Sequence, residues 1–167
     1  LPVDNGDYDI VEDATAGYTT TYNNCTAVTI ADNTQTCTIT NNDITPSLTL
    51  TKIVNNNYGG SALITDWTLT ATGPTTISGA GGASSGPSFD AGVYTLSETT
   101  SQTGYTSDPW ICTGGVQVGN QISIALGDTV SCSIASNDVQ PQLTVIKNVV
   151  NDNGGGLGPE GFTINVS

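Results

Sequence analysis

Apolar residues alternate with Thr, Ser and Asn in many short runs along this sequence. The stretch LTLTKIV, residues 48–54, is one example, and LTVIKNV, residues 143–149, is another. An alternation of period two, carried largely by β-branched side chains, is typical of strands with one buried face. No window shows the three- and four-residue spacing of an amphipathic helix. The pattern therefore predicts an all-β protein.

The middle of the chain contains enough of these runs for one β-sandwich. The expected strands cover residues 47–54, 64–72, 92–98, 106–112, 121–126 and 129–135, with a further excursion through the Gly- and Ser-rich stretch GAGGASSG. About seven short strands separated by turn residues are typical of an Ig-like sandwich.

The chain also repeats itself. Lys147 follows Lys52 by 95 positions, and the same spacing relates three further pairs: Cys37 to Cys132, Pro46 to Pro141, and Leu48 to Leu143. Nearer the N-terminus the spacing is 86 or 87, as in Tyr8 to Tyr94, Tyr18 to Tyr105, and Cys25 to Cys112. Similarity at a nearly fixed spacing predicts tandem β-sandwich domains.

The register of the repeat predicts one complete domain between two incomplete ones. Residues 1–45 correspond to the C-terminal half of one β-sandwich, residues 46–140 to a complete β-sandwich, and residues 141–167 to the N-terminal strands of the next. An incomplete β-domain exposes unpaired strand edges. Either the sequence belongs to a longer array, or the leading strands of one copy complete the trailing half of another by strand addition. Both arrangements give a string of domains joined end to end.

Composition narrows the possible functions. The formal net charge of −13 repels phosphate backbones and anionic lipid headgroups, so we expect no nucleic-acid binding. No apolar run approaches the length that spans a bilayer, so we expect no membrane insertion. The absence of His and of any nucleophile–base motif argues against an enzyme, and we expect no cofactor. The Asp- and Asn-bearing turns lack the spacing of a calcium loop, so we expect no metal.

Four cysteines in a polar, acidic chain indicate disulfides and an oxidising compartment. We expect two local bridges, Cys25 with Cys37 and Cys112 with Cys132; free core thiols are the alternative. The spacing of these residues does not fit a zinc site. The cysteines therefore favour an extracellular or cell-surface location.

The two lysines are the only cationic side chains, and both occupy the same repeated strand position. Because alternate residues of a strand share a face, Lys52 lies on the apolar, inward face. The same alternation gives three further inward rows that end in a polar residue: Tyr94, Leu96 and Glu98; Tyr8, Ile10 and Glu12; and Cys37, Ile39 and Asn41. From the residues alone, each lysine is either paired with a glutamate or discourages unwanted pairing at a strand edge.

Three motifs resemble the B-repeat type of collagen-adhesin domain, also called SpaA-like or prealbumin-like, which occurs in bacterial surface adhesins and pilus subunits. They are LTLTK on the first strand, AGVYTLSETTSQTGY in the middle and CTITNND on the last strand, and they cover nearly the whole chain. The resemblance implies a prealbumin-like sandwich. It also implies a spontaneous amide, or isopeptide bond, between the lysine and an Asn of the last strand, with the glutamate assisting.

On this sequence the resemblance implies an amide between Lys147 and Asn41, assisted by Glu12. This requires that Lys147, in the incomplete domain of residues 141–167, meets a half-domain of the type that residues 1–45 form. The complete module departs from the motif, because Ser136 stands at the position of Asn41. Asn137 is one residue out of register, so an amide between Lys52 and Asn137 beside Glu98 is the less favoured possibility.

The sequence therefore predicts a structural, non-enzymatic segment of an extracellular filament, pilus-like fibre or surface stalk. Its expected partners are copies of itself or neighbouring repeats, arranged head to tail. The alternative is a surface adhesin or carbohydrate-binding module that uses a loop such as GAGGASSG. Asn24 and Asn165 lie in N-glycosylation motifs, and many Ser and Thr residues face outward, so attached glycans are a further expectation.

Overall fold

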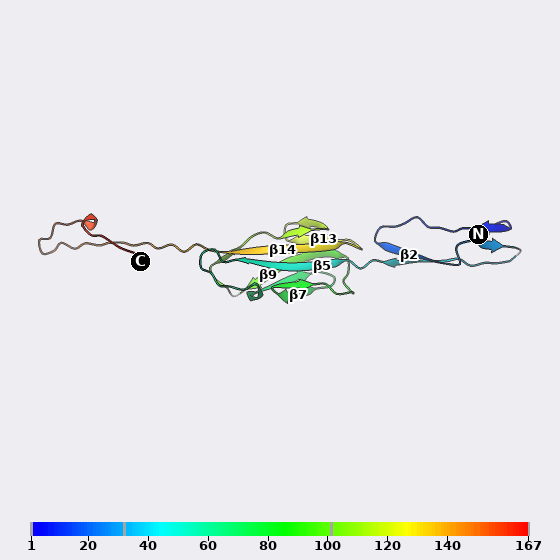
Figure 1. Ribbon diagram of the computed structural model, residues 1–167, viewed down its shortest axis with the longest axis horizontal. Helices are drawn as coiled ribbons and strands as arrows, with labels where there is room; N and C mark the ends of the chain where they lie inside the picture. Colours follow the sequence, from blue (N-terminus) through cyan, green and yellow to red (C-terminus); the bar gives the residue numbers. More distant parts are fainter. Residues whose placement is uncertain (1, 32, 101, 167) are drawn as a thin grey trace.

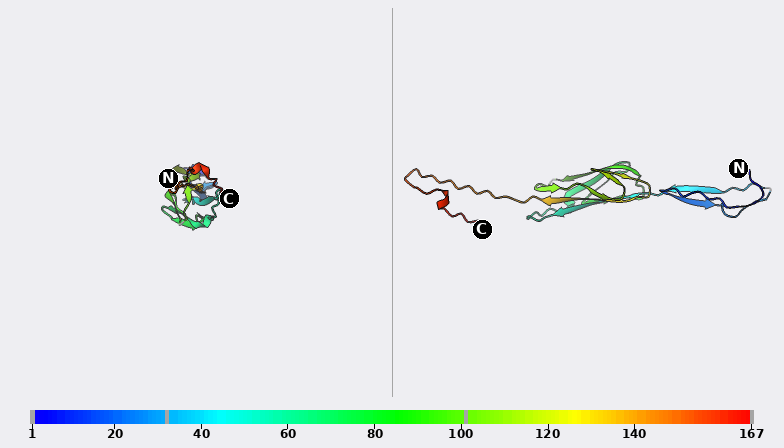
Figure 2. Two further views of the ribbon diagram at one scale, coloured as in Figure 1. Left: turned by 90° about the vertical axis from the view of Figure 1, so that its left-hand side faces the viewer. Right: turned by 90° about the horizontal axis from the view of Figure 1, so that it is seen from above.

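The computed structural model describes residues 2–31, 33–100 and 102–166. It has three parts that follow one another along a single long axis (Figure 1). A small β-unit lies at the N-terminal end, a β-sandwich lies in the middle, and an extended segment follows toward the C-terminus. The view along the axis in Figure 2 shows how narrow this arrangement is. None of the described helices is long and apolar enough to span a membrane.

The sandwich consists of two five-stranded sheets. One sheet has the order β10-β14-β5-β8, with β11 also paired to β14, and the other has the order β12-β13-β9-β6-β7. The strands of the first sheet are β5 (Ser47–Asn55), β8 (Gly82–Ser84), β10 (Tyr105–Ser107), β11 (Ile111–Thr113) and β14 (Thr129–Asp138). Those of the second are β6 (Trp67–Thr72), β7 (Ile77–Ala80), β9 (Gly92–Thr100), β12 (Val116–Val118) and β13 (Gln121–Ile124). The predicted all-β sandwich is confirmed.

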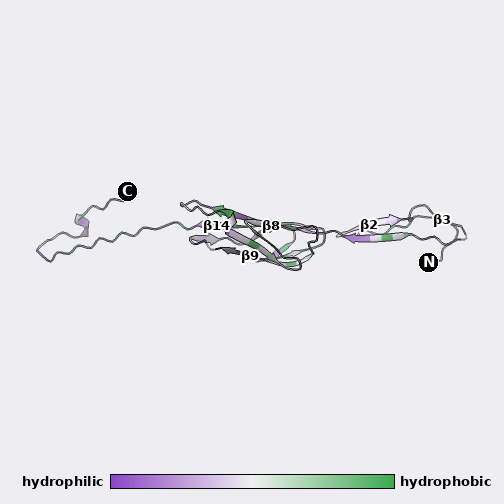
Figure 3. Ribbon diagram, turned by 90° about the horizontal axis from the view of Figure 1, so that it is seen from below, coloured by the Kyte–Doolittle hydropathy of each residue, from purple (hydrophilic) through white to green (hydrophobic). Residues whose placement is uncertain are grey.

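Alternate residues of the strands form the core between the two sheets. Hydrophobic and hydrophilic residues follow one another along the strands (Figure 3). The apolar side chains of β5, β6, β9, β13 and β14 meet in one cluster that includes Leu48, Leu50, Leu69, Tyr94, Leu96, Ile122, Val130 and Ile134. Each fully buried side chain of this size contributes about 1.5–3 kcal/mol relative to an exposed one, so the alternation supplies most of the force that holds the sheets together.

Four of the six expected strands differ from the observed ones only by one to three residues at one end, and the other two differ in kind. The run 106–112 is divided into β10 and β11, because Pro109 between them has no backbone N–H for the sheet and Trp110 turns into the core. The run 64–72 begins with a 3-10 helix, η1 (Ile64–Asp66), before β6. Its first turn is closed by the Asp66 carboxylate, which accepts the Leu63 N–H at 2.8 Å.

The N-terminal unit is built like part of the sandwich. It contains β1 (Gly6–Tyr8), β2 (Tyr18–Asn23), β3 (Val28–Ile30) and β4 (Thr38–Asp43), paired as β1 with β3 and β2 with β4. Tyr8 lies opposite Val28 as Tyr94 lies opposite Ile122. Tyr18 likewise lies opposite Asp43 as Tyr105 lies opposite Asp138. Among the described residues of this unit, no strand takes the place of β5 or β6.

The C-terminal segment carries the sequence of β5 and β6 without their sheet. Its described residues from 141 onward contain no strand and one 3-10 helix, η2 (Pro159–Gly161). Apolar side chains that would be buried in a sheet are instead in solvent, and Leu143 is 72% exposed and Val145 is 51% exposed.

Candidate functional site

Lys52 is buried between the two sheets. Strand alternation places it on the same face of β5 as Leu48 and Leu50, as the sequence predicted, and only 3% of the residue is exposed. Its hydrogen-bond partners are Glu98 from β9 and Ser136 from β14, and Ser107 from β10 bridges these two.

Two hydrogen bonds and one aromatic ring surround the Lys52 ammonium. Nζ donates to Glu98 Oε2 at 2.5 Å and to Ser136 Oγ at 2.6 Å, and lies 4.8 Å from the centre of the Trp67 ring. Glu98 Oε1 accepts a hydrogen bond from the Ser107 hydroxyl, which lies 2.9 Å from that of Ser136. Every buried side-chain nitrogen and oxygen in the described part of the chain has a partner. A buried charge is tolerated only under such conditions.

The structure does not bring Asn137 to Lys52. Asn137 Oδ1 accepts a hydrogen bond from Asn55 Nδ2 at 2.7 Å, and its Nδ2 donates to Asp108 Oδ2 at 3.1 Å. The residue that faces Lys52 is Ser136, whose hydroxyl offers no carbonyl carbon for an amine to attack. In the sandwich Lys52 therefore forms an ion pair with Glu98, and none of its hydrogen-bond partners among the described residues is an amide side chain.

A second cluster forms in the N-terminal unit. Asn41 Nδ2 donates to both carboxylate oxygens of Glu12, at 2.9 Å and 3.1 Å, and Asn41 Oδ1 accepts from the Thr20 hydroxyl at 2.7 Å. Thr20 lies opposite Asn41 on β2, just as Ser107 lies opposite Ser136 on β10. The two clusters therefore match position by position, except that the N-terminal one has an amide and no lysine.

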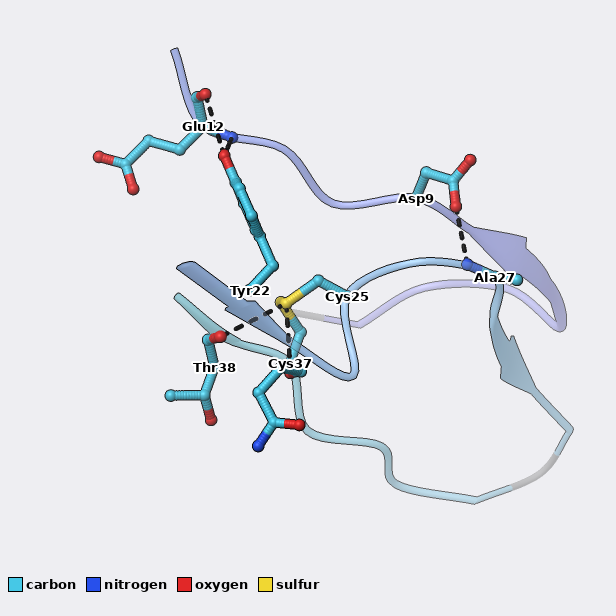
Figure 4. Close-up of a disulfide and its surroundings, with 8 residues drawn as sticks. Asp9, Glu12, Tyr22, Cys25, Ala27, Cys37 and Thr38 are labelled. Atoms are coloured by element: carbon cyan, nitrogen blue, oxygen red, sulfur yellow. Dashed lines mark hydrogen bonds between the residues drawn. A yellow bond between two sulfur atoms is a disulfide. The ribbon is translucent and has the colours of Figure 1, made fainter. Parts of the chain in front are cut away.

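The backbone around Glu12 is held by Tyr22 (Figure 4). The Tyr22 hydroxyl accepts from the Glu12 N–H at 3.0 Å and donates to the Glu12 carbonyl at 3.2 Å. The carboxylate is thereby kept against the amide nitrogen of Asn41. Asn41 Nδ2 must receive a proton if it is to leave as ammonia, and the Glu12 carboxyl is in position to supply it.

Lys147 belongs to the C-terminal segment, whereas Glu12 and Asn41 belong to the N-terminal unit, and Figure 1 shows these two parts on opposite sides of the sandwich along the long axis. Its Nζ is 4.5 Å from the centre of the Phe162 ring. The structure of one copy therefore separates Lys147 from the other two predicted members of the site.

Both cysteine pairs form disulfides. Cys25 and Cys37 have their Cα atoms 4.7 Å apart, and Cys112 and Cys132 have theirs 4.0 Å apart. Cys112 lies directly opposite Cys132 in the pairing of β11 with β14. Figure 4 shows the N-terminal bridge beside the Tyr22–Glu12 contact, and this disulfide ties the residue just before β4 to the loop that follows β2.

The two glycosylation motifs lie in the outer parts of the chain. Asn24 is exposed, in a turn where its φ is 55°. Asn165 is exposed, but Ser167 of its motif lies outside the described residues. Among the described residues, no group of three or more His, Cys, Asp or Glu could hold a metal ion.

Sequence reasoning missed the role of Asp138 at the end of β14. Its carboxylate accepts three backbone N–H groups of the loop after β5, from Asn57 at 2.8 Å, Tyr58 at 2.7 Å and Gly60 at 2.9 Å. Burial raises the pKa of Asp138, but these hydrogen bonds outweigh it and hold the pKa below its usual value. The repeat of Tyr18 and Asp43 as Tyr105 and Asp138 is the signal that could have identified this residue.

Comparison with known protein families gives two matches to one SpaA-type family, which is described as a prealbumin-like fold domain. The matches cover residues 1–45 and residues 43–134. Comparisons with curated proteins and with solved structures give no significant match.

Proposed function

We propose a structural role for this chain, which belongs to the SpaA-type family of prealbumin-like fold domains. In this proposal the chain is a segment of an extracellular filament, pilus-like fibre or surface stalk. In this proposal residues 46–140 form one complete domain. Residues 141–167 of one copy complete the half-domain that residues 1–45 form in another.

One observation supports the proposal above the others. The N-terminal unit repeats the strand pairs of the sandwich in the same register but has no counterpart of β5 or β6 among its described residues. The sequence of β5 recurs at residues 142–150, and that of β6 begins again at Phe162. The N-terminal unit and the C-terminal segment are therefore complementary parts of one domain type.

The sandwich gives the register of the proposed pairing. Because β5 runs parallel to β14 with Lys52 opposite Ile134, residues 142–150 would run parallel to β4 with Lys147 opposite Ile39. Because Leu69 lies opposite Glu98 in the β6–β9 pair, Ile164 would lie opposite Glu12. Such strand addition is held by main-chain hydrogen bonds and by side chains that enter alternate pockets.

The same register brings Lys147 beside Glu12 and Asn41. In the amide-forming step, the uncharged Lys147 Nζ attacks Asn41 Cγ, a new Nζ–Cγ bond forms, and the Cγ–Nδ2 bond breaks. The Glu12 carboxyl transfers a proton from Nζ to Nδ2, so that one ammonia leaves. Desolvation disfavours the charged form of a lysine, and contact between the groups makes the step effectively unimolecular.

Electrophoresis of the assembled protein in SDS, after boiling with a reductant, tests both parts of the proposal. We expect a ladder of covalently joined copies, and peptides in which Lys147 is linked to Asn41 with the loss of one ammonia. Asn41→Ala should abolish the ladder, whereas the matched control Asn42→Ala should keep it. Lys147→Arg should also abolish the ladder but still give filaments in negative-stain images, because strand addition does not need the amide.

A compact, stable monomer at all concentrations, with no filaments for any variant, would contradict the proposal. Most of the ligand loop suggested for the adhesin alternative, GAGGASSG, lies in β7 and β8 at the edges of the two sheets. A glycan-array signal from a protein that does not assemble would favour that alternative.

A further inference from the structure

The loop after β5 is held by Tyr105 of β10 as well as by Asp138 of β14. The Tyr105 hydroxyl donates to Asn56 Oδ1 at 2.6 Å and accepts the Ala62 N–H at 3.1 Å. Asn56 Nδ2 also donates to the Ala62 carbonyl at 3.1 Å, which closes the loop on itself. The Asp138 carboxylate and the Tyr105 hydroxyl thus hold residues 56–62 mainly through backbone groups. The contacts therefore constrain the shape of the loop more than its sequence.

The C-terminal segment already has the shape of this loop. Asn151 Nδ2 donates to the Leu157 carbonyl at 3.0 Å, which repeats the bond from Asn56 to Ala62 at the 95-residue spacing. The 3-10 helix Pro159–Gly161 repeats Ile64–Asp66 at the same spacing. The contact of Lys147 with the Phe162 ring likewise repeats that of Lys52 with Trp67.

The glycine of the loop is repeated as well. A Cβ atom on Gly155 would lie 2.7 Å from Asn151 Oδ1, and one on Gly60 would lie 2.9 Å from Asn56 Oδ1. A larger residue at either position would have to displace the neighbouring Asn side chain. The segment therefore presents the backbone N–H groups of residues 152–155 as the sandwich loop presents those of residues 57–60, but without a carboxylate to receive them.

The N-terminal unit has the counterparts of the two residues that hold the loop in the sandwich. Tyr18 and Asp43 face each other across β2 and β4, as Tyr105 and Asp138 do across β10 and β14. Tyr18 is 42% exposed, and Asp43 is also exposed. Neither the Tyr18 hydroxyl nor the Asp43 carboxylate hydrogen-bonds to a residue that the structure describes.

On the premise of the proposed strand addition, we propose that Tyr18 and Asp43 form a second docking site, which receives the loop of residues 151–157 from the incoming copy. Asp43 accepts the backbone N–H groups of Asp152, Asn153 and Gly155. The Tyr18 hydroxyl donates to Asn151 Oδ1 and accepts the Leu157 N–H.

This loop dock determines the register of assembly. Strands of alternating apolar residues can slip by two positions and still bury the same face. A slip by two residues would move Lys147 away from Asn41. It would also move the loop away from Tyr18 and Asp43, so the hydrogen bonds of the dock would be lost. The dock therefore makes the register that permits the amide the most stable one.

Hydrogen exchange of the full chain, followed by mass spectrometry of its peptides, tests the dock. The Lys147→Arg background is used so that assembly stays reversible. In assembled protein we expect slow exchange both in the strand peptide, residues 142–149, and in the loop peptide, residues 150–158. In the unassembled protein both should exchange fast.

Two substitutions in that background remove the dock without changing the incoming strand, residues 142–150. Asp43→Asn places an amide N–H₂ against N–H donors, and Tyr18→Phe removes only the hydroxyl. Each should return the loop peptide to fast exchange, leave the strand peptide protected, and raise the critical concentration for assembly about tenfold or more. The matched controls Asp13→Asn and Tyr58→Phe, at exposed positions outside the dock, should change neither quantity.

The outcomes separate this inference from the proposed function. A protected strand peptide beside a loop peptide that exchanges fast in the assembled background protein overturns the dock and leaves strand addition intact. The absence of assembly, with both peptides exchanging fast at every concentration, overturns strand addition and the dock together.

Discussion

Lys52 Nζ lies 2.5 Å from Glu98 Oε2, in an ion pair where the lysine side chain has no exposed surface and the glutamate side chain is 14% exposed. The pair joins β5 of one sheet to β9 of the other. Removing one charge leaves the other buried without a partner, which typically costs about 3–5 kcal/mol. We therefore expect Glu98→Gln to lower the free energy of unfolding of the sandwich by roughly 3 kcal/mol.

Urea denaturation followed by Trp fluorescence measures this effect, because Trp67 and Trp110 are the only tryptophans and both lie in the sandwich. Replacing both partners, as in Lys52→Met with Glu98→Leu, should recover most of the loss. A single-variant loss below about 1 kcal/mol would show that the pair is more hydrated than its burial indicates.

Ser136→Asn should introduce the amide-forming chemistry into the sandwich. Ser136 Oγ is 2.6 Å from Lys52 Nζ, and Glu98 Oε2 is 2.5 Å from the same amine. An Asn amide at position 136 would lie beside the Lys52 amine, which is the nucleophile, and the Glu98 carboxyl, which carries the proton. These two groups are already in contact. Intact mass spectrometry should show the loss of one ammonia, and the double variant Ser136→Asn with Glu98→Ala should keep its full mass.

The lowered pKa of Asp138 predicts an acid-sensitive contribution to stability. The folded pKa lies below the ordinary value of 3.8, so the stabilisation is complete above that pH and is lost as the pH falls through the folded pKa. Asp138→Asn should lower the unfolding midpoint at neutral pH. The difference from the parent protein should shrink below pH 3.8, and a difference that stays constant through that range would contradict the assignment.

Loss of the Cys112–Cys132 bridge should destabilise the sandwich. The bridge closes a loop with a sequence separation of 20, for which the chain-entropy estimate is about 3 kcal/mol. Cys112→Ala with Cys132→Ala should shift the Trp-detected urea midpoint accordingly. The matched pair Cys25→Ala with Cys37→Ala should leave that midpoint unchanged, because this bridge lies wholly in the N-terminal unit.

Much of the fold followed from the alternation of residues. A strand has a fixed period of two, so the inward position of Lys52, and of Ser136 in place of an amide, could be predicted without knowing the sheet order. The single strand expected over residues 106–112 was wrong because the apolar pattern continues across Pro109, whereas the hydrogen-bond ladder does not.

The details of the clusters could not be predicted in the same way. Ser107 reaches Glu98 only because β10 pairs with β14 in a particular register, and that register depends on contacts between residues far apart in the sequence. Asp138 appeared in the sequence as one more turn residue. Its role depends on three N–H groups of a loop that precedes it by about 80 residues.

The parallel pairing of β5 with β14 has a mechanical consequence. The chain enters the sandwich at the start of β5 and leaves it at the end of β14, and the two strands are paired side by side from Thr129↔Ser47 to Asn137↔Asn55 (Figure 1). Tension applied through the two ends of the domain pulls these neighbouring strands in opposite directions along their length. The hydrogen bonds between them must then break together rather than one after another. Single-molecule stretching should accordingly show one abrupt rupture of the sandwich at high force, instead of a gradual peeling of its strands.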